Sequence, residues 1–461
     1  MNNEVTVKGV WWLPEKPERR LAGEITYGSN SGARLSLYDH FFENPMAGGF
    51  AVWGMTVKGE DVSLFNCHAT SISAHFIGGR VAEIVAYSGV IGGHFQSADQ
   101  MKFIKVTAEL SHLHEWAWRS GLQLTRKKSG KGWQVTHDML PEIRLAALGD
   151  FELGLEFTGQ LLPEYGKCSL SENCLLAVEA KKLMPFESFE TIILQFQGFV
   201  ALALTRPVYT RSLKGRIDKP KAIIQGQSIY DDFEIIRKDA PRDEKNERLM
   251  PHDMQFCLVD LQPEPSAFIK QYFEKRKLLE PVSDLYLSTL YNPRMYVQQR
   301  YLALAHAIEA YHRAFVGGKY QSNDEYRDGL EKRLWDAVPE TIDPDFRSSL
   351  KNKLKYLHEF SLRKRVRDIC EKYSTVLTPY LGEATAFASA VADQRNLLTH
   401  PDPTSEEQRP PIDLIKVWLK CEQLSLLLEV CLLHEIGFSE EEVSKLMQRN
   451  RRIQAIQLNR K

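Results

Sequence analysis

The chain has 461 residues, enough for two to three domains of usual size. Hydrophobic residues make up 43% and charged residues 26%, an ordinary globular composition that excludes a fibrous or largely disordered protein. The formal net charge of −1 excludes a chain that is basic throughout. A local basic surface stays open, because attraction to phosphate depends on where the charge sits.

Cysteine usage and hydropathy bear on where the chain works. The seven cysteines form no CxxC pair, so their spacing predicts no zinc site, and their odd number suits a reducing cytosol. The N-terminus lacks the apolar core of a signal peptide, and no apolar run reaches the ~18 residues that span a membrane. We therefore expect a cytoplasmic protein without membrane contact.

The first 265 residues are predicted to form a β-rich domain. Short segments with alternating or β-branched residues recur there, separated by turn residues. The clearest are Val5–Val10, Leu21–Tyr27, Arg34–Tyr38, Ala51–Val57, Phe103–Leu110, Gln134–His137 and Phe151–Phe157. This spacing predicts antiparallel sheets in a sandwich or distorted barrel. We expect its tryptophans to be core residues: Trp11, Trp12, Trp53, Trp116, Trp118 and Trp133.

The pattern then becomes helical. A helix is predicted at Ser266–Leu279, within a linker spanning 266–295, and a helical domain of about five helices is predicted at 296–461. Its first helix has a stripe with spacings of three and four: Val297, Tyr301, Leu304, Ile308, Tyr311 and Phe315. Further helices are expected at Phe346–Tyr373, Glu383–Thr399 and Ile412–Ile436, and Ser439 with Glu442 predicts a capping box for the last helix. The fold class is therefore α+β, a β-rich domain followed by an all-α bundle.

One stretch suggests chemistry. VADQRNLLTHPD, residues 391–402, lies at the end of a predicted helix, and Pro401 forces a break there. Arg395 is followed by the polar Asn396, and His400 stands five positions after Arg395, which is the R-x4-H motif. This motif resembles that of the HEPN superfamily of metal-independent ribonucleases.

Other segments extend the resemblance over most of the chain. The helix Tyr301–Arg313 is similar to the first core helix of the ApeA-type HEPN domain. Trp11–Pro14 and Leu110–Trp116 resemble the ApeA N-terminal domain. The motif alone is weak, and the helix pattern and the order of the domains make the resemblance more specific.

The resemblance assigns catalysis to Arg395, Asn396 and His400, and the chemistry suits these residue types. RNA supplies its own nucleophile, the 2′-OH. Histidine can remove and donate protons because its pKa lies near neutrality, and arginine stays charged and binds phosphate oxygens through two parallel donors. No metal or other cofactor is then needed. The products would be a 2′,3′-cyclic phosphate and a 5′-OH.

Geometry adds a condition. Positions 395 and 400 lie about 140° apart around an ideal helix and do not share a face. HEPN ribonucleases dimerise so that motifs of two protomers meet in one cleft, and the resemblance therefore implies a homodimer through the helical domain. Ala388 and Ala392 precede Arg395 on its stripe and would let another helix approach closely.

Two further groups are candidates. Glu309 and His306 share a stripe with Leu302 and Arg313 and could support the active cleft, although Glu309 could equally form a surface ion pair with Arg313. A basic cluster could guide an RNA backbone or could be a solvated helix face. Its members are Arg363, Lys364, Arg365 and Arg367.

The sequence thus predicts an RNA endonuclease. The resemblance implies a toxin or effector of anti-phage defence by abortive infection, with transfer RNA as a candidate substrate and a phage-derived trigger sensed by the β-rich domain. The alternative is a non-catalytic HEPN interaction module beside a ligand- or protein-sensing β domain. Arg395 would then be a surface residue paired with Asp402, and His400 a cation favoured by the helix dipole. The presence of all three motif residues argues against that alternative.

Overall fold

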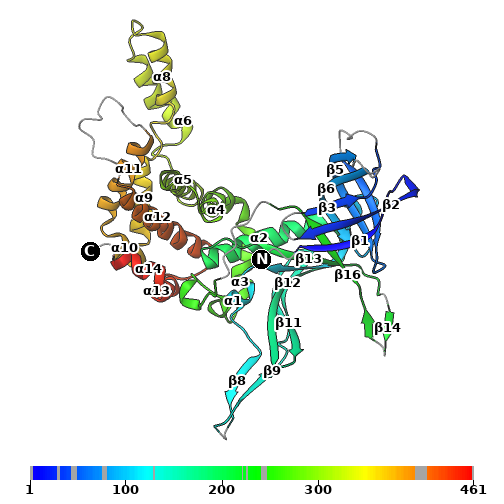
Figure 1. Cartoon of the computed structure of the whole chain (residues 1–461). Coiled ribbons are helices and arrows are strands. Elements are labelled where there is room, and N and C mark those ends of the chain that lie inside the picture. The colour runs from blue at the N-terminus through cyan, green and yellow to red at the C-terminus, as the bar shows by residue number, and fades with distance from the viewer. Residues whose placement is uncertain are drawn as a thin grey trace. The chain divides into compact units, whose positions relative to one another are not determined.

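The computed structural model describes residues 4–28, 32–42, 49–74, 80–127, 130–220, 222–224, 227–239, 247–399 and 413–458 (Figure 1). The chain forms two compact units, Met1–Lys270 and Gln271–Lys461. The first is built mainly from strands and the second from helices, as the α+β prediction required.

Six antiparallel strands of the first unit close into a barrel. They are β1 (Val5–Leu13), β2 (Lys16–Gly28), β3 (Gly32–Leu37), β4 (Phe50–Thr56), β5 (Asp61–Ala74) and β6 (Arg80–Ile91). They pair in the order β6–β3–β2–β1–β4–β5, and the pairing of β5 with β6 closes the ring. Alternate side chains point inward, so Trp11, Ile25 and Leu64 are fully buried. A Cβ on Gly54 would come within 2.1 Å of the Trp11 ring, so a larger residue does not fit there.

The sheet continues beyond the barrel through β6. The added strands are β7 (Lys102–Leu110), β10 (Ile143–Leu148), β11 (Phe151–Glu164), β12 (Lys167–Pro185), β13 (Thr210–Arg216) and β16 (Asp232–Arg237). Their order outward from β6 is β16–β13–β7–β12–β11–β10. Helix α2 (Phe186–Leu204) packs on β12 and β7. We did not predict this helix, although Phe186, Phe189, Ile193 and Phe196 are buried and repeat at spacings of three and four.

Smaller elements decorate this unit. They are α1 (Leu113–Ala117), the ribbon β8 (Leu122–Arg126) and β9 (Trp133–His137), the ribbon β14 (Ala222–Ile224) and β15 (Gln227–Ile229), and 3-10 turns at Ala98–Gln100, Pro251–Asp253 and Leu258–Leu261. Both ribbons extend away from the body of the unit (Figure 1). Trp133 is 64% exposed and Trp118 39% exposed, so the prediction that both are core residues was wrong.

The second unit is helical. After α3 (Pro265–Glu274), which spans the boundary between the units, its helices are α4 (Arg276–Tyr291), α5 (Val297–Phe315), α6 (Asn323–Tyr326), a π-helical turn (Arg327–Glu331), α7 (Lys332–Asp336), α8 (Pro344–Leu354), α9 (Leu362–Lys372), α10 (Ser374–Leu381), α11 (Ala384–Thr399), α12 (Leu414–Glu435), α13 (Glu440–Arg449) and α14 (Arg451–Leu458). The described part of the unit thus has more than the five helices we expected. Helix α5 buries Tyr301, Leu304, Ile308 and Tyr311 of the predicted stripe. The Ser439–Glu442 capping box also forms.

Two predicted helices are each divided. The helix expected at Ser266–Leu279 is interrupted at Lys275, between α3 and α4. The one expected at Phe346–Tyr373 is split into α8 and α9, because Phe360 N–H donates to Gly318 O at 2.8 Å and the Ser361 hydroxyl then accepts from Lys364 N–H at 3.3 Å. These bonds draw the backbone out of the helix and cap a new one.

A buried ionic cluster ties α12 to its neighbours. Glu429 is fully buried, accepts a hydrogen bond from the Tyr286 hydroxyl at 2.7 Å, and pairs with Arg452 of α14. Glu422 lies 3.2 Å from Arg452 Nη1 and 2.7 Å from Arg300 Nη1. The cluster therefore joins α4, α5 and α14 to the central helix α12.

Candidate functional site

Helix α11, which bears the predicted motif, is fixed along its length. The Glu383 carboxylate accepts hydrogen bonds from Thr385 N at 2.8 Å and Ala386 N at 2.6 Å, and these bonds lower the pKa of Glu383. The Tyr301 hydroxyl of α5 donates to Val391 O at 2.7 Å. One face packs on α9, and its buried residues are Phe387, Ala388, Val391 and Ala392. Both alanines are buried and α11 packs on α9 and α5, as expected for small residues that let another helix approach closely.

The C-terminal end of α11 holds the described motif residues. Arg363 Nη2 of α9 donates to Asp393 Oδ1 at 2.8 Å and ties this end to α9. Arg395 is half-buried and Asn396 is exposed. Arg395 Nη1 donates to Asn396 Oδ1 at 3.4 Å, which positions the guanidinium beside the amide. The Thr399 hydroxyl donates to Arg395 O at 3.0 Å and satisfies one carbonyl of the last turn.

The remaining motif residues, His400 and the neighbouring Asp402, lie outside the described residues. No carboxylate in the described part of the chain pairs with Arg395. Arginine presents planar donors that match two phosphate oxygens, so this end of α11 can bind an anion.

The predicted auxiliary residues lie elsewhere on α5. His306 is exposed and Glu309 is half-buried. Within the described ranges, no hydrogen bond or ion pair joins either residue to Arg395 or Asn396. Glu309 lies instead within electrostatic range of Arg365. Arg313, the alternative partner that we proposed for Glu309, pairs with Glu359 at 2.9 Å.

The predicted basic cluster divides into surface and interior residues. Arg363 pairs with Asp393 at 2.8 Å and Lys364 with Asp368 at 3.0 Å, while Arg367 lies 3.7 Å from Glu371. Arg365 is only 1% exposed, so its prediction as an RNA-binding residue was wrong. The side chain points inward because α9 buries the face that also holds Val366, Ile369 and Cys370.

Arg365 belongs to a buried polar group that sequence reasoning missed. Its Nε donates to Phe360 O at 3.0 Å and its Nη2 to Gly318 O at 3.2 Å. His312 is fully buried beside it, with Nδ1 2.9 Å from Gly317 O and Nε2 3.3 Å from Asp368 Oδ2. Burial lowers the pKa of His312, and the adjacent Arg365 lowers it further. The group joins α5, α9 and the connection after α5.

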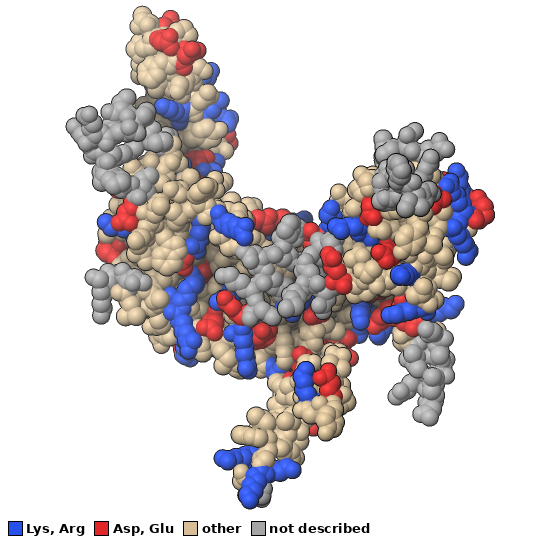
Figure 2. All heavy atoms as spheres, in the orientation of Figure 1, with Lys and Arg blue, Asp and Glu red and all other residues tan. Residues whose placement is uncertain are grey.

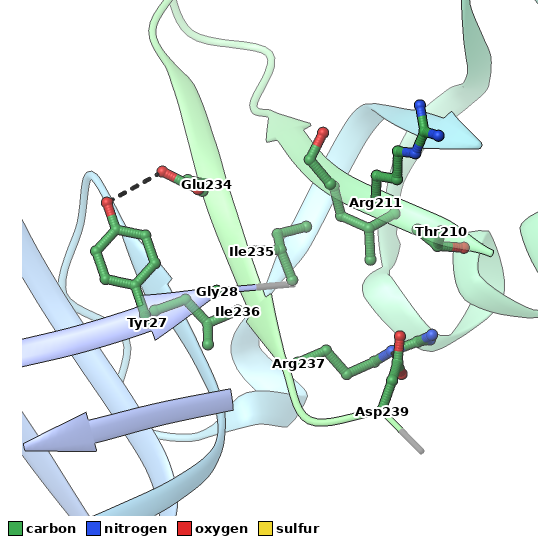
Figure 3. A pocket seen from close by; sticks show the side chains of 11 residues that line it. Tyr27, Gly28, Thr210, Arg211, Glu234, Ile235, Ile236, Arg237 and Asp239 are labelled. Atoms are coloured by element: carbon green, nitrogen blue, oxygen red, sulfur yellow. Dashed lines mark hydrogen bonds and ion pairs between the residues drawn. The ribbon is translucent and has the colours of Figure 1, made fainter. Parts of the chain in front are cut away.

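In the first unit, a small cavity lies beside β2, β13 and β16 (Figure 3). The Tyr27 hydroxyl donates to Glu234 Oε2 at 3.4 Å. Burial, with the neighbouring Glu234 carboxylate, raises the pKa of Tyr27 to about 12, and burial also raises the pKa of Glu234. The cavity holds about 40 Å³, which is room for water and too little for a small-molecule ligand.

Among the described residues, no group of three or more His, Cys, Asp or Glu side chains is placed to hold a metal ion. None of the described helices combines the length and apolar character needed to cross a membrane.

A unit with a closed six-stranded barrel, followed by a helical unit with an R-x4-H motif at a helix end, defines a two-domain HEPN protein. Residues 6–270 match the family described as ApeA N-terminal domain 1, and residues 302–442 match Apea-like HEPN. The chain belongs to the ApeA family. No curated protein and no solved structure matches it significantly.

Proposed function

We propose that the chain is a metal-independent RNA endonuclease of anti-phage defence, with Arg395, Asn396 and His400 as its catalytic residues. The main support is the place of the motif. All three residues lie within the Apea-like HEPN region, and Arg395 and Asn396 reach the surface at the C-terminal end of α11. An arginine and an amide held 3.4 Å apart at a helix end suit a phosphate group.

The reaction needs no group beyond side chains and RNA. The 2′-oxygen attacks the adjacent phosphorus as His400 removes its proton, and the bond from phosphorus to the 5′-oxygen breaks as that oxygen gains a proton. Arg395 stabilises the negative charge on the phosphorus oxygens, and Asn396 orients the guanidinium. The products are a 2′,3′-cyclic phosphate and a 5′-OH.

A homodimer through the helical unit would complete the site. One imidazole removes a proton while a second can donate one, and two motifs facing each other provide both. Two arginines in one groove also increase attraction to the RNA backbone. We propose that RNA, with transfer RNA as a candidate, is the substrate, and that the first unit senses a phage-derived trigger that releases the toxic activity.

The test is incubation of the purified chain with total RNA in EDTA, followed by mapping of the cut ends. Cleavage should persist without divalent metal, leave cyclic phosphate ends, and fail on a substrate with 2′-deoxyribose at the cut site. Arg395→Ala and His400→Ala should abolish it. Arg327→Ala, which removes an exposed arginine from the same unit, should cut like wild type.

Three results would contradict the proposal. Wild-type cleavage by the Arg395 or His400 variant would remove these residues from the mechanism. Activity lost in EDTA and restored by magnesium would indicate a metal-dependent reaction. Absence of cleavage under every condition, including infection, would favour the non-catalytic interaction module.

A further inference from the structure

The hairpin of β8 and β9, residues 121–138, forms an arm on the first unit (Figure 1). Its two strands pair only with each other and form a sheet separate from the 12-stranded one, as far as the described residues show. Nearly all of its described residues are exposed or half-buried. An isolated two-stranded hairpin contributes little core, so the sequence of this arm is not explained by packing.

The charge of the arm differs from that of the chain. Lysine and arginine balance aspartate and glutamate overall, at 59 and 60. The arm, residues 121–138, holds four lysines and arginines, Arg126, Lys127, Lys128 and Lys131, against one carboxylate, Asp138 at its base, and Arg119 precedes it. Lys128 lies outside the described residues. Figure 2 shows lysine and arginine side chains gathered at the free end of the arm.

One face of the arm is apolar and uncovered. The register places Arg126 opposite Trp133 and Leu124 opposite Val135, and these four side chains share a face because cross-strand partners point the same way. Leu124 is 65%, Trp133 64% and Val135 56% exposed. The opposite face holds Gln123, Thr125, Gln134 and Thr136. Arginine and tryptophan thus stand side by side on the apolar face near the free end.

The base of the arm is held firmly on β12. The Glu172 carboxylate, whose side chain is only 3% exposed, accepts from Gly121 N at 2.7 Å, just before β8, and from His137 Nε2 at 3.0 Å, at the end of β9. Asp138 N also donates to Gly121 O at 3.1 Å. These bonds fix the orientation of the base. The arm can therefore present its apolar face to a partner without a prior ordering of its base.

A recess of about 510 Å³ lies at the base of the arm. Trp118, Arg119 and Arg248 line it together with the carboxylates of Glu115 and Glu172. Trp118 has a φ of 49°, in the left-handed region that a bulky residue rarely adopts. The backbone N–H of Trp118 donates to His114 O at 3.1 Å, and Arg119 O lies 2.8 Å from His114 Nε2. These contacts hold the unusual backbone conformation in place. Strained residues of this kind cluster at binding sites.

We propose that the β8–β9 arm binds a single-stranded nucleic acid. Trp133 and Trp118 stack on unpaired bases, and the neighbouring arginines and lysines neutralise phosphates. A nucleic-acid strand alternates charged phosphates with flat rings. The cross-strand pair of Arg126 and Trp133 on the arm, with Trp118 and Arg119 at its base, offers groups that match both. An acidic protein would use the positive charge but would leave the indoles without flat partners. This binding is independent of the nuclease proposed for the helical unit.

The test uses the full chain with Arg395→Ala, so that a probe stays intact whether or not the nuclease proposal holds. Fluorescence anisotropy would measure binding to an oligouridylate, an oligothymidylate and a duplex, each of about 12 nucleotides. Either single strand should bind better than the duplex, and the comparison of the first two distinguishes RNA from DNA. Photo-crosslinking should place the adducts on Trp133 and its neighbours.

Substitutions separate charge from stacking. The triple variant Arg126→Ala, Lys127→Ala, Lys131→Ala should lose about tenfold in affinity and lower the slope of log affinity against log salt by about 2, at ~0.7 per phosphate contact. Trp133→Ala should lose about fivefold or more, and Trp133→Phe should retain most binding. The matched control, Lys8→Ala, Lys58→Ala, Lys102→Ala, removes the same charge from exposed positions outside the arm and should bind like the parent.

Several outcomes overturn the proposal. They are preference for the duplex over both single strands, equal losses in the two triple variants, and a Trp133→Ala variant that binds as well as its parent. Complete competition by polyglutamate would assign the arm to an acidic protein partner instead.

Discussion

Arg452→Met tests the buried ionic cluster of the helical unit. The substitution keeps a long, flexible side chain but removes the charge that faces two carboxylates, Glu429 at 1% and Glu422 at 10% side-chain exposure. Arg300 stays beside Glu422, so Glu429 is affected most. Breaking a buried ion pair by removing one partner costs about 3–5 kcal/mol, because the remaining charge is buried without compensation. Domains unfold with about 5–15 kcal/mol, so the loss should leave the unit marginally stable.

The effect should depend on pH. Burial raises the pKa of Glu422, but Arg452 and Arg300 more than offset this and hold it below the ordinary glutamate value. A carboxyl with a lowered pKa stabilises the folded state above its unfolded pKa, and this contribution is lost as the pH falls through the folded pKa. Without Arg452 the pKa of Glu422 rises. The difference in the free energy of unfolding between variant and wild type is therefore largest at neutral pH. It becomes smaller as the pH falls toward the pKa of glutamate.

The loss in the free energy of unfolding can be measured by hydrogen exchange with mass spectrometry at increasing urea. Peptides from α12 and α14 report on the helical unit alone, even if the other unit unfolds separately. Lys416→Met is the matched control, because Lys416 lies on α12 with a side chain that is 81% exposed, and it should change stability by less than ~0.5 kcal/mol. An Arg452→Met protein within ~1 kcal/mol of wild type at neutral pH, or a deficit that stays constant on acidification, would falsify this reasoning.

Two further predictions concern assembly and barrel packing. A heterodimer of wild-type and tagged His400→Ala subunits should have far less than half of the wild-type nuclease activity if one groove uses both histidines; half activity, or a fully active monomer, would indicate independent sites. Gly54→Ala should destabilise the first unit by ~1–3 kcal/mol, because the new methyl group meets the Trp11 ring. Thermal unfolding would measure the change in stability. Trp11→Leu should recover part of that loss in the double variant, and strictly additive losses would rule out this contact as the cause.

The sequence predicted the elements whose patterns are local. The stripe of α5 repeats every three to four residues, and a capping box at Ser439 marked the start of α13. The break between α8 and α9 depends on a hydrogen bond from Phe360 N to Gly318 O, which joins segments far apart in the chain. Such a contact leaves no trace in helical periodicity. Helix α2 has the three-and-four spacing of an amphipathic helix only in its first half, and its second half, from Gly198 to Leu204, is buried throughout and shows no period.

For the candidate site, the sequence located Arg395 and Asn396 at a helix end, because the motif precedes Pro401. It misplaced Arg365, although the spacing of four to Ile369 puts this residue on the buried face. The prediction relied on the positive charge of Arg365 and its basic neighbours, although the helical periodicity of the apolar residues indicated burial. Trp133 was misjudged for the opposite reason, since a large apolar residue in a strand suggests a core that this two-stranded ribbon lacks.

The closeness of its two ends makes the β8–β9 arm a module. Gly121 and Asp138 are hydrogen-bonded neighbours, and a Cβ on Gly121 would meet Asp138 O at 1.9 Å, so the chain leaves and rejoins the body of the unit at nearly one point. A short turn could replace everything between these residues without moving a strand of the large sheet. The arm can therefore lengthen, shorten or exchange its side chains during evolution while the barrel and the helical unit stay unchanged.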